Sequence, residues 1–274
     1  MANLFSTVPA WIILVIIILF SCLVTWAAFK LLRKLFTSAE LEKFKDVTGI
    51  YVSMIGILYG VFLAFIVIAI WENYDGVKNN IDKEADALSN MYRDAKGLPP
   101  AMKFSVDSCI KKYVTFVVDD EWTMMSYGKE SKSAMDASSK LQNLVIKFKP
   151  HDLGEQVVYT EMLSNLNHLA TARRVRVNTA NAGLPEILWV ILIGGGLLLL
   201  FYIACFYVEN YKFHLWLAFG VSGLIAILLF VALELNYPFV GSDAIKPDAF
   251  EALKTHKIQV DSTVVKPAPV DTGR

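Results

Sequence analysis

Residues able to carry out chemistry are few in this sequence, and their spacing does not gather them into a site. The four histidines lack i, i+4 pairing and have no carboxylate at metal-ligand spacing. No serine lies in a nucleophile-elbow context, no glycine loop could hold a phosphate, and no dinucleotide fingerprint is present. The histidines are His151, His168, His214 and His256. The sequence therefore predicts neither an enzyme nor a metal site nor a cofactor.

The cysteines do not form a recognisable redox or metal pattern either. Cys22, Cys109 and Cys205 are an odd number without metal-ligand or redox spacing, and two of them fall in apolar stretches. We therefore predict no disulfide framework and no zinc site.

Two charged clusters could attract ions. The acidic run Asp119–Glu121 could hold a cation, but three consecutive acids on a helix point in different directions, which favours a solvated face. The basic cluster of Arg173, Arg174 and Arg176 lies shortly before an apolar stretch. It could bind lipid head groups or draw anions toward a pore entrance, and a membrane-proximal anchor fits equally well.

Composition favours a membrane protein. Hydrophobic residues make up 55% of the chain, charged residues 19%, and the mean hydropathy is +0.46, with the apolar residues gathered in blocks. The formal net charge is zero. This argues against a nucleic-acid partner, because neutralising phosphates requires a surplus of Lys and Arg.

Four charge-free stretches are long enough to cross a bilayer, which requires about 20 apolar helical residues. They are Val8–Phe29, Val47–Trp71, Ile187–Val208 and Phe213–Leu233. The first lacks the basic leader of a secretory signal and is too long for a cleaved peptide, so we expect it to be retained as a span.

The middle of the chain is polar but carries apolar residues at helical spacing. The stripes are Leu88, Met91, Tyr92 and Ala95; Ile110, Tyr113, Val114 and Val117; and Leu163, Leu166 and Leu169. Breaks at Leu98–Pro100, Tyr127–Gly128 and Lys149–Pro150 predict about four helices, and Gly183–Pro185 ends this region before the third span. The first helix should continue directly from the second span, because only a tolerable Gly76 interrupts it.

These elements predict an all-α, polytopic membrane protein with four transmembrane helices and a helical soluble domain between spans two and three. The predicted parts are a first helix pair (1–71), the soluble domain (72–183), a second helix pair (184–236) and a C-terminal tail (237–274). Pro238, Gly241 and Pro247 predict that the tail is partly extended, and its end is expected to be disordered.

Helical spacing separates two useful faces of the second span. Gly56, Gly60 and Ala64 form a small-residue ridge that would let another helix approach closely. The adjacent ridge of Ser53, Ile57 and Val61 is uncharged and could line a hydrophobic constriction, which gates ions by dewetting. Ordinary helix packing or lipid contact would explain that ridge equally well. In the third span, Gly194–Gly196 is expected to permit helix contact rather than to hold phosphate.

Two segments of this sequence resemble bestrophin channels. The first is Gly60–Phe65 followed by Trp71, Glu72, Asn73 and Tyr74 and then by Glu84–Leu88, and it resembles the exit of the bestrophin pore helix. The second is Glu234–Asp243, in which Asn236, Pro238, Phe239 and Gly241 resemble the Asn-Pro-Phe-Gly segment after the last bestrophin span. The whole layout is similar to a bacterial bestrophin-like membrane family.

The resemblance implies a homo-oligomer, a pentamer, in which five second spans surround a central anion pathway that passes ions such as chloride. Ser53, Ile57 and Val61 would then fall at the neck, the narrowest part of the pore. Tyr237 and Val240 interrupt the Asn-Pro-Phe-Gly run. The acidic cluster of calcium-gated members is missing, since Asp243, Asp248 and Glu251 are dispersed.

Orientation follows from the resemblance and not from charge, because basic residues near the spans are equally frequent on the two faces. One face has Lys30, Arg33, Lys34, Lys43, Lys45 and Lys212, and the other has Lys78, Lys83, Arg173, Arg174, Arg176 and Lys246. The resemblance implies a cytoplasmic soluble domain on a protein of the bacterial inner membrane, in contact with lipid. We predict an oligomeric, anion-permeable channel. The alternative is a non-conducting scaffold or sensor whose helical domain recruits a partner.

Overall fold

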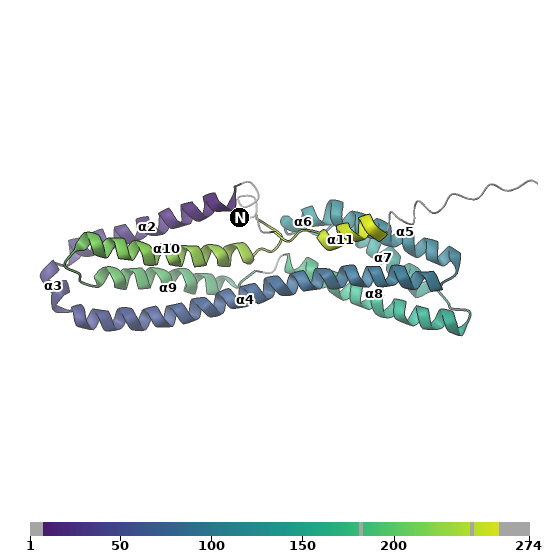
Figure 1. The fold of residues 1–274 in the computed structure, drawn as a ribbon, viewed down its shortest axis with the longest axis horizontal. Helices are drawn as coiled ribbons and strands as arrows, with labels where there is room; N and C mark the ends of the chain where they lie inside the picture. Colours follow the sequence, from purple (N-terminus) through teal and green to yellow (C-terminus); the bar gives the residue numbers. More distant parts are fainter. Residues whose placement is uncertain (1–7, 181–182, 242–243, 258–274) are drawn as a thin grey trace, which may run out of the picture. The chain divides into compact units, whose positions relative to one another are not determined.

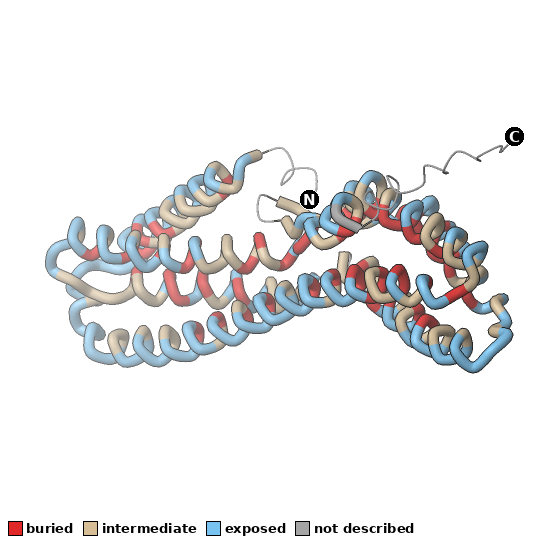
Figure 2. The backbone as a smooth tube through the Cα atoms, turned by 45° about the vertical axis from the view of Figure 1, so that its right-hand side comes forward, coloured by how far each residue is buried: buried red, intermediate tan, exposed pale blue. Residues whose placement is uncertain are grey.

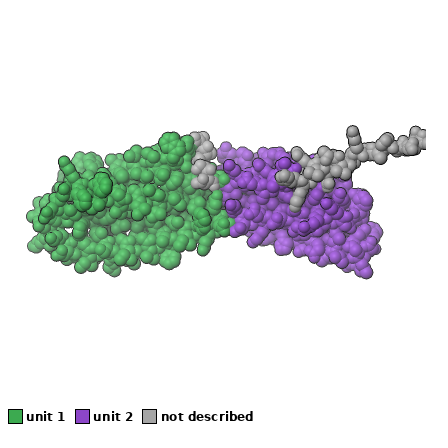
Figure 3. All heavy atoms as spheres, in the orientation of Figure 1, with its two compact units in different colours: residues 1–75, 183–244 green, residues 76–182, 245–274 purple. Residues whose placement is uncertain are grey.

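The computed structural model describes residues 8–180, 183–241 and 244–257, and in these residues every regular element is a helix (Figure 1). The predicted all-α class is therefore confirmed. The chain divides into two compact units (Figure 3): unit 1 is residues 1–75 with 183–244, and unit 2 is residues 76–182 with 245–274. Helix α4 (Lys45–Asp94) contributes its first part to unit 1 and its last part to unit 2.

Unit 1 contains the apolar helices. Helices α2 (Ala10–Leu35), α9 (Glu186–Cys205) and α10 (Tyr211–Leu235), together with the apolar part of α4, are long and apolar enough to cross a membrane. This confirms the four predicted spans. Between α2 and α4 lies the short helix α3 (Ser38–Lys43), which begins at a capping box formed by Thr37 and Glu40.

The spans of unit 1 pack through two apolar clusters. The larger joins α4, α9 and α10, and the smaller joins the end of α2 to α9 and α10. Helices α2 and α10 also contact each other through a 2.6 Å hydrogen bond between the hydroxyls of Ser21 and Ser222. The outward faces of these helices remain exposed and apolar (Figure 2), as lipid requires.

Unit 2 is built from successive helices separated at the predicted breaks. After α4 come the 3-10 turn η1 (Ala95–Gly97), α5 (Pro100–Phe116), the π-helical turn η2 (Val117–Glu121), α6 (Trp122–Ser126), α7 (Lys132–Lys147) and α8 (Leu153–Thr179). Prolines start α5, and the side chains of Ser131 and Asp152 cap α7 and α8. The predicted continuation of the second span into the first helix of the polar region is also confirmed, because α4 has no interruption at Gly76.

The core of unit 2 contains the predicted stripes. The members from Leu88 to Ala95 and from Ile110 to Val117 are buried, whereas in α8 Met162 takes the buried position in place of the half-buried Leu163. The tail, predicted to be partly extended, has no regular helix over residues 237–241 and 244–247. It then contains two short helical segments that the sequence did not predict, α11 (Asp248–Ala252) and η3 (Leu253–Lys257). The end of the tail, predicted to be disordered, lies outside the described residues.

Candidate functional site

Helix α4 buries one stripe of its apolar part inside unit 1. Tyr59, Leu63, Ile66 and Ile70 follow each other at spacings of four, three and four residues and are each less than 9% exposed. They pack against α9 and α10. This spacing places them on one face of the helix, so the opposite face of α4 has no partner within the described part of this chain.

The predicted pore ridge lies on that opposite face. Ile57 is 68% exposed and Val61 is 52% exposed, and at about 100° per residue both lie roughly half a turn from the buried stripe. Ser53 is also exposed but lies further round the helix. The i+4 series continues to Phe65, which is 68% exposed and which the sequence analysis did not include. The outward-facing surface is therefore a continuous uncharged ridge.

The hydroxyl of Ser53 does not change the apolar character of this ridge. It donates a 2.9 Å hydrogen bond to the carbonyl of Gly49 in the same helix, so its proton is used within α4. The remaining ridge side chains, Ile57 and Val61, carry no polar atom. Such a surface can form a dewetting constriction if several copies face one axis.

The small-residue ridge of α4 has little contact inside this chain. A Cβ placed on Gly56 would lie 3.8 Å from Leu199, an ordinary contact, whereas one on Gly60 would meet nothing within 4 Å. Ala64 is exposed. The close approach between spans is instead made by Tyr59, whose ring lies against Gly195 and Gly196 of α9. The expectation that Gly194–Gly196 permits helix contact is confirmed at these two glycines.

Trp71, Glu72, Asn73 and Tyr74 follow the apolar part of α4. The first three are exposed, Trp71 by 58%, and Tyr74 is half-buried. An indole at the end of an apolar span is typical of a membrane interface.

The segment from Asn236 to Gly241, which follows α10, is hydrogen-bonded to the residues just before α9. Asn236 is 3% exposed, and its side-chain oxygen accepts a 2.7 Å hydrogen bond from the backbone N–H of Leu184. Pro238 and Phe239 are buried. Gly241 has φ +102°, and a Cβ there would lie 2.7 Å from a carboxylate oxygen of Glu234, so this position requires glycine.

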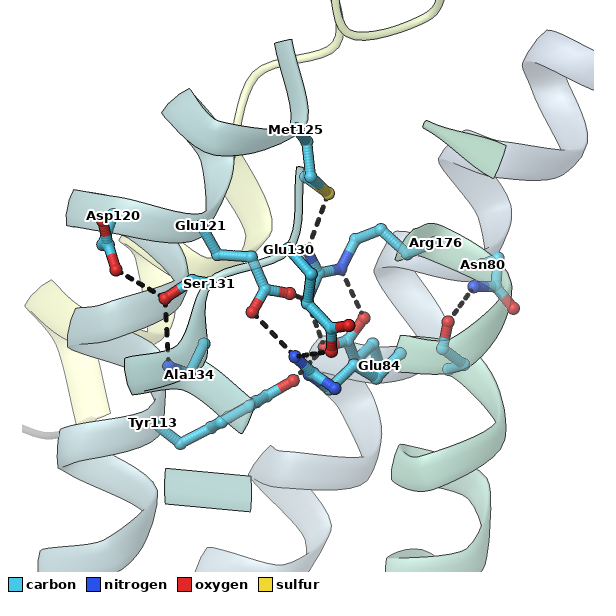
Figure 4. A network of polar contacts seen from close by, with 12 residues as sticks. Asn80, Glu84, Tyr113, Asp120, Glu121, Met125, Glu130, Ser131, Ala134 and Arg176 are labelled. Atoms are coloured by element: carbon cyan, nitrogen blue, oxygen red, sulfur yellow. Dashed lines mark hydrogen bonds and ion pairs between the residues drawn. The ribbon is translucent and has the colours of Figure 1, made fainter. Parts of the chain in front are cut away.

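Unit 2 contains a buried ion cluster that joins four of its helical segments (Figure 4). The guanidinium of Arg176 in α8 binds both carboxylate oxygens of Glu84 in α4, at 2.7 and 3.0 Å, and lies 3.0 Å from Glu121 in η2. Arg173 binds the other oxygen of Glu121 at 3.0 Å and also Glu130. The hydroxyl of Tyr113 in α5 donates a 2.5 Å hydrogen bond to Glu84. Glu84, Glu121 and Arg176 have no exposed side-chain surface.

Electrostatics keeps Arg176 and Tyr113 of this cluster protonated. Burial would lower the pKa of Arg176, but the carboxylates of Glu84 and Glu121 raise it above its usual value. Burial, with a further contribution from Glu84, raises the pKa of Tyr113 well above 10.0. Arg176 therefore stays charged and Tyr113 stays protonated as a donor.

Aromatic side chains cover the guanidinium of Arg176. Its central carbon lies 5.4 Å from the ring centroid of Trp122 and 5.6 Å from that of Phe250, which comes from α11. The two rings meet edge to face, and the Trp122 indole N–H donates to the carbonyl of Ile245. The segment that follows unit 1 therefore completes the shielding of the cluster.

These contacts correct two expectations. The acidic run is not a solvated face throughout, because Glu121 is buried between two arginines, while Asp119 is exposed and binds Lys254. The arginine cluster is not available as a whole to lipid or to ions, because Arg176 and most of Arg173 are buried in ion pairs and only Arg174 is exposed. Helical spacing explains both results. Glu121 lies four residues after the buried Val117, and Arg176 lies seven residues after the buried Leu169, so each lies on a buried apolar stripe.

The cluster has an architectural role. Both carboxylates of the core are bound by arginines, so they are not available for a cation. Over the ranges that the structure describes, no group of three or more His, Cys, Asp or Glu side chains is arranged to hold a metal ion. The arrangement connects α4 to α5, η2 and α8.

Comparison with known proteins gives a consistent result. A model of the Bestrophin-like domain family matches residues 15–250. A crystal structure of a bacterial bestrophin homologue from Klebsiella pneumoniae, carrying one mutation, is similar with a TM-score of 0.67, 14% identity, and coverage of 92% of this chain and 99% of that one. Another structure of the Klebsiella pneumoniae homologue gives a TM-score of 0.65, 14% identity, and coverage of 91% and 98%. No curated protein matches in sequence.

Proposed function

This chain belongs to the bestrophin-like family, and from that membership we propose that it is an oligomeric, anion-permeable channel of the membrane. In this proposal several copies surround a central axis, and α4 of each copy lines the pore. The neck is formed by Ser53, Ile57 and Val61, and inorganic anions such as chloride pass through it.

The observation that carries the proposal is the uncharged, unpartnered face of α4. Ile57 and Val61 point away from the helices of their own chain and are 68% and 52% exposed. In a pore, this face would form an apolar constriction whose barrier depends on its width. Contact with lipid would leave the same uncharged face exposed, so a measurement of conduction is needed to distinguish a pore from a lipid-facing helix.

The assembly follows the family pattern in our proposal. We expect a homo-oligomer, by resemblance a pentamer, with Gly60 and Ala64 in contacts between copies, while Gly56 faces Leu199 of its own chain. The open space at Gly60 supports this, since a glycine with no atom of its own chain within 4 Å of its Cβ position leaves room for a neighbouring helix. The helical domain between spans two and three is placed on the cytoplasmic side of the bacterial inner membrane, with lipid around the outward-facing spans.

Anion flux through purified protein in liposomes tests the proposal. The comparison is between wild type, Ile57→Ala and empty vesicles. The substitution should raise chloride flux by roughly threefold, equivalent to about 0.7 kcal/mol of barrier, because it widens an apolar constriction in every copy. Leu224→Ala is the matched control, because Leu224 is 58% exposed but lies on a different span, α10.

Two outcomes would contradict the channel. One is a monomer when the mass is measured in detergent. The other is an absence of flux from both proteins despite verified insertion and oligomerisation. Either result would favour the alternative of a non-conducting scaffold or sensor. If flux is present but unchanged in Ile57→Ala, the protein is a pore and Ile57 is not at its neck.

A further inference from the structure

Tyr59 occupies a slot in α9 that only glycine can provide. A Cβ placed on Gly195 would lie 2.8 and 3.0 Å from two ring carbons of Tyr59. A Cβ placed on Gly196 would lie 3.0 Å from the Tyr59 hydroxyl oxygen and 3.5 Å from Ile225. Separations of 2.8–3.0 Å are too short for non-bonded carbon atoms, so the ring rests directly on the backbone of α9.

A hydrogen bond holds the ring in this slot. The hydroxyl of Tyr59 donates to the backbone carbonyl of Leu192 at 3.1 Å, and the contact is buried. A hydroxyl without a partner is costly in apolar surroundings, so moving the ring out of the slot would lose this bond as well as the packing. The steric fit of the ring and the hydrogen bond of the hydroxyl therefore both hold Tyr59 against α9.

The position of Tyr59 relates this slot to the outward face of α4. Ile57 and Val61 are each two residues from Tyr59, which corresponds to about 200° round a helix. Fixing the ring of Tyr59 against α9 thus turns both ridge side chains away from the core. We infer that Tyr59 is the positioning residue of α4, setting the rotation of this helix that presents Ile57 and Val61 to the axis.

The other members of the buried stripe are less able to define a rotation. Leu63, Ile66 and Ile70 are aliphatic, make no hydrogen bond through their side chains, and pack in a larger apolar cluster. Aliphatic side chains of similar size can repack at low cost. Tyr59 alone in this stripe combines a shape-specific contact with a directed bond. The importance of this position for conduction rests on the proposed function, whereas the rotation itself does not.

Disulfide formation between α4 and α9 measures this rotation directly. The parent protein has Cys22, Cys109 and Cys205 replaced by alanine and carries Gly56→Cys with Leu199→Cys. A Cβ at Gly56 would lie 3.8 Å from Cδ1, at the tip of the Leu199 side chain, so these two positions face each other across α4 and α9. Disulfide formation depends steeply on the separation of the two Cβ atoms, so its rate, measured relative to the parent protein, reports small rotations of α4.

A matched pair of glycine variants separates the slot from general crowding. Gly195→Val places a side chain in the slot, while a Cβ at the adjacent Gly194 meets nothing within 4 Å. In Gly195→Val the rate of disulfide formation should fall by about tenfold or more, because the geometric requirement is strict. Gly194→Val should react at the parent rate. Equal rates in the two variants would overturn the inference.

Substitutions of the tyrosine give an independent measurement. Tyr59→Ala empties the slot and should slow disulfide formation as Gly195→Val does, whereas Tyr59→Phe keeps the ring and should restore the rate to within about threefold of the parent. A tyrosine that only stabilised the fold would lower the thermal unfolding temperature in Tyr59→Ala without changing the rate of disulfide formation in the folded protein. Parent-like disulfide formation in Tyr59→Ala would contradict the positioning role.

Flux measurements on the same variants connect rotation to conduction. Gly195→Val should abolish the increase in anion flux caused by Ile57→Ala, whereas Gly194→Val should preserve it. Disulfide formation does not require an open pore. Loss of flux in every protein, including the parent, with the expected pattern of disulfide rates would overturn the channel and support the positioning role. Normal flux with identical disulfide rates in all variants would overturn the positioning role and leave the channel standing.

Discussion

The two units of this protein bury polar groups in different ways. Between the spans of unit 1, hydroxyl groups make isolated neutral hydrogen bonds, such as Ser21 with Ser222 and Tyr59 with the carbonyl of Leu192. In unit 2 the core contains a connected ion cluster centred on Arg176 and Glu84, both without exposed side-chain surface. One unit relies on shape, and the other on charge pairing, to decide which helix faces meet.

The solvent around each unit explains the difference. Lipid tails are as apolar as leucine, so spans gain little from burying apolar side chains and their packing depends on close fit. A helical domain in water gains from apolar burial, and its stripes could meet in several arrangements. Separating Arg176 from Glu84 or Glu121 would leave a buried charge without its partner. We infer that the ion cluster selects one arrangement of unit 2.

The largest effect should come from removing the central cation of unit 2. Arg176→Met leaves the buried carboxylates of Glu84 and Glu121 without this arginine, so the free energy of unfolding should fall by about 3–5 kcal/mol. Hydrogen exchange of the α5 and α8 amides in detergent measures this locally. Arg174→Met is the control, because Arg174 is the exposed member of the same cluster. Equal protection in both variants would refute the role of the cluster.

A smaller loss is expected when one donor to the cluster is removed. Tyr113→Phe deletes the hydroxyl that donates to Glu84 but leaves the ring and both contacts from Arg176. A hydrogen bond to a charged group contributes about 1.5–3 kcal/mol, so the α5 and α8 amides should exchange faster than in wild type but more slowly than in Arg176→Met. If Tyr113→Phe exchanges as fast as Arg176→Met, the hydroxyl contributes as much to the stability of the cluster as the arginine does.

Alkaline pH should weaken the same contact gradually. Burial and Glu84 raise the pKa of Tyr113 in the folded protein well above 10.0, whereas an unfolded tyrosine loses its proton near 10.0. The contribution of Tyr113 to stability is therefore complete below about pH 10 and decreases as the pH rises toward the folded pKa. Unfolding measured from about pH 8 to 11 should show a steeper decline in wild type than in Tyr113→Phe. Tyr127→Phe, an exposed control, should follow wild type.

Much of the fold could be predicted from the sequence because its signals are local. Charge-free stretches of sufficient length predicted the four spans, and Pro and Gly predicted the breaks between the helices of unit 2. The short helix α11 within the tail was missed, because it has five residues and follows Pro247. Phe250 of α11 is buried against Trp122, which is distant in the sequence, and local periodicity cannot show such a contact.

The ion cluster was missed although its signal is present in the sequence. Glu84 lies four residues before Leu88, Glu121 lies four after Val117, and Arg176 lies seven after Leu169, so all three occupy apolar stripes. A charged residue on such a stripe requires a partner, and complementary charges on three stripes predict an ion cluster. Adjacent acids and adjacent arginines had instead been interpreted as surface runs. The rotation of α4 was beyond sequence reasoning, because the slot for Tyr59 is formed by glycines more than a hundred residues away.

The smallest effect should come from a single hydrogen bond between spans. Ser21→Ala removes the 2.6 Å contact with Ser222 that joins α2 to α10. Hydrogen bonds between membrane helices contribute about 0.6 kcal/mol on average, so thermal unfolding in detergent should shift only slightly. Cys22→Ala, at the neighbouring and half-buried position, is the control. A loss as large as that of Arg176→Met would show that unit 1 also depends on directed polar contacts, and the contrast between shape in the spans and charge pairing in unit 2 would fail.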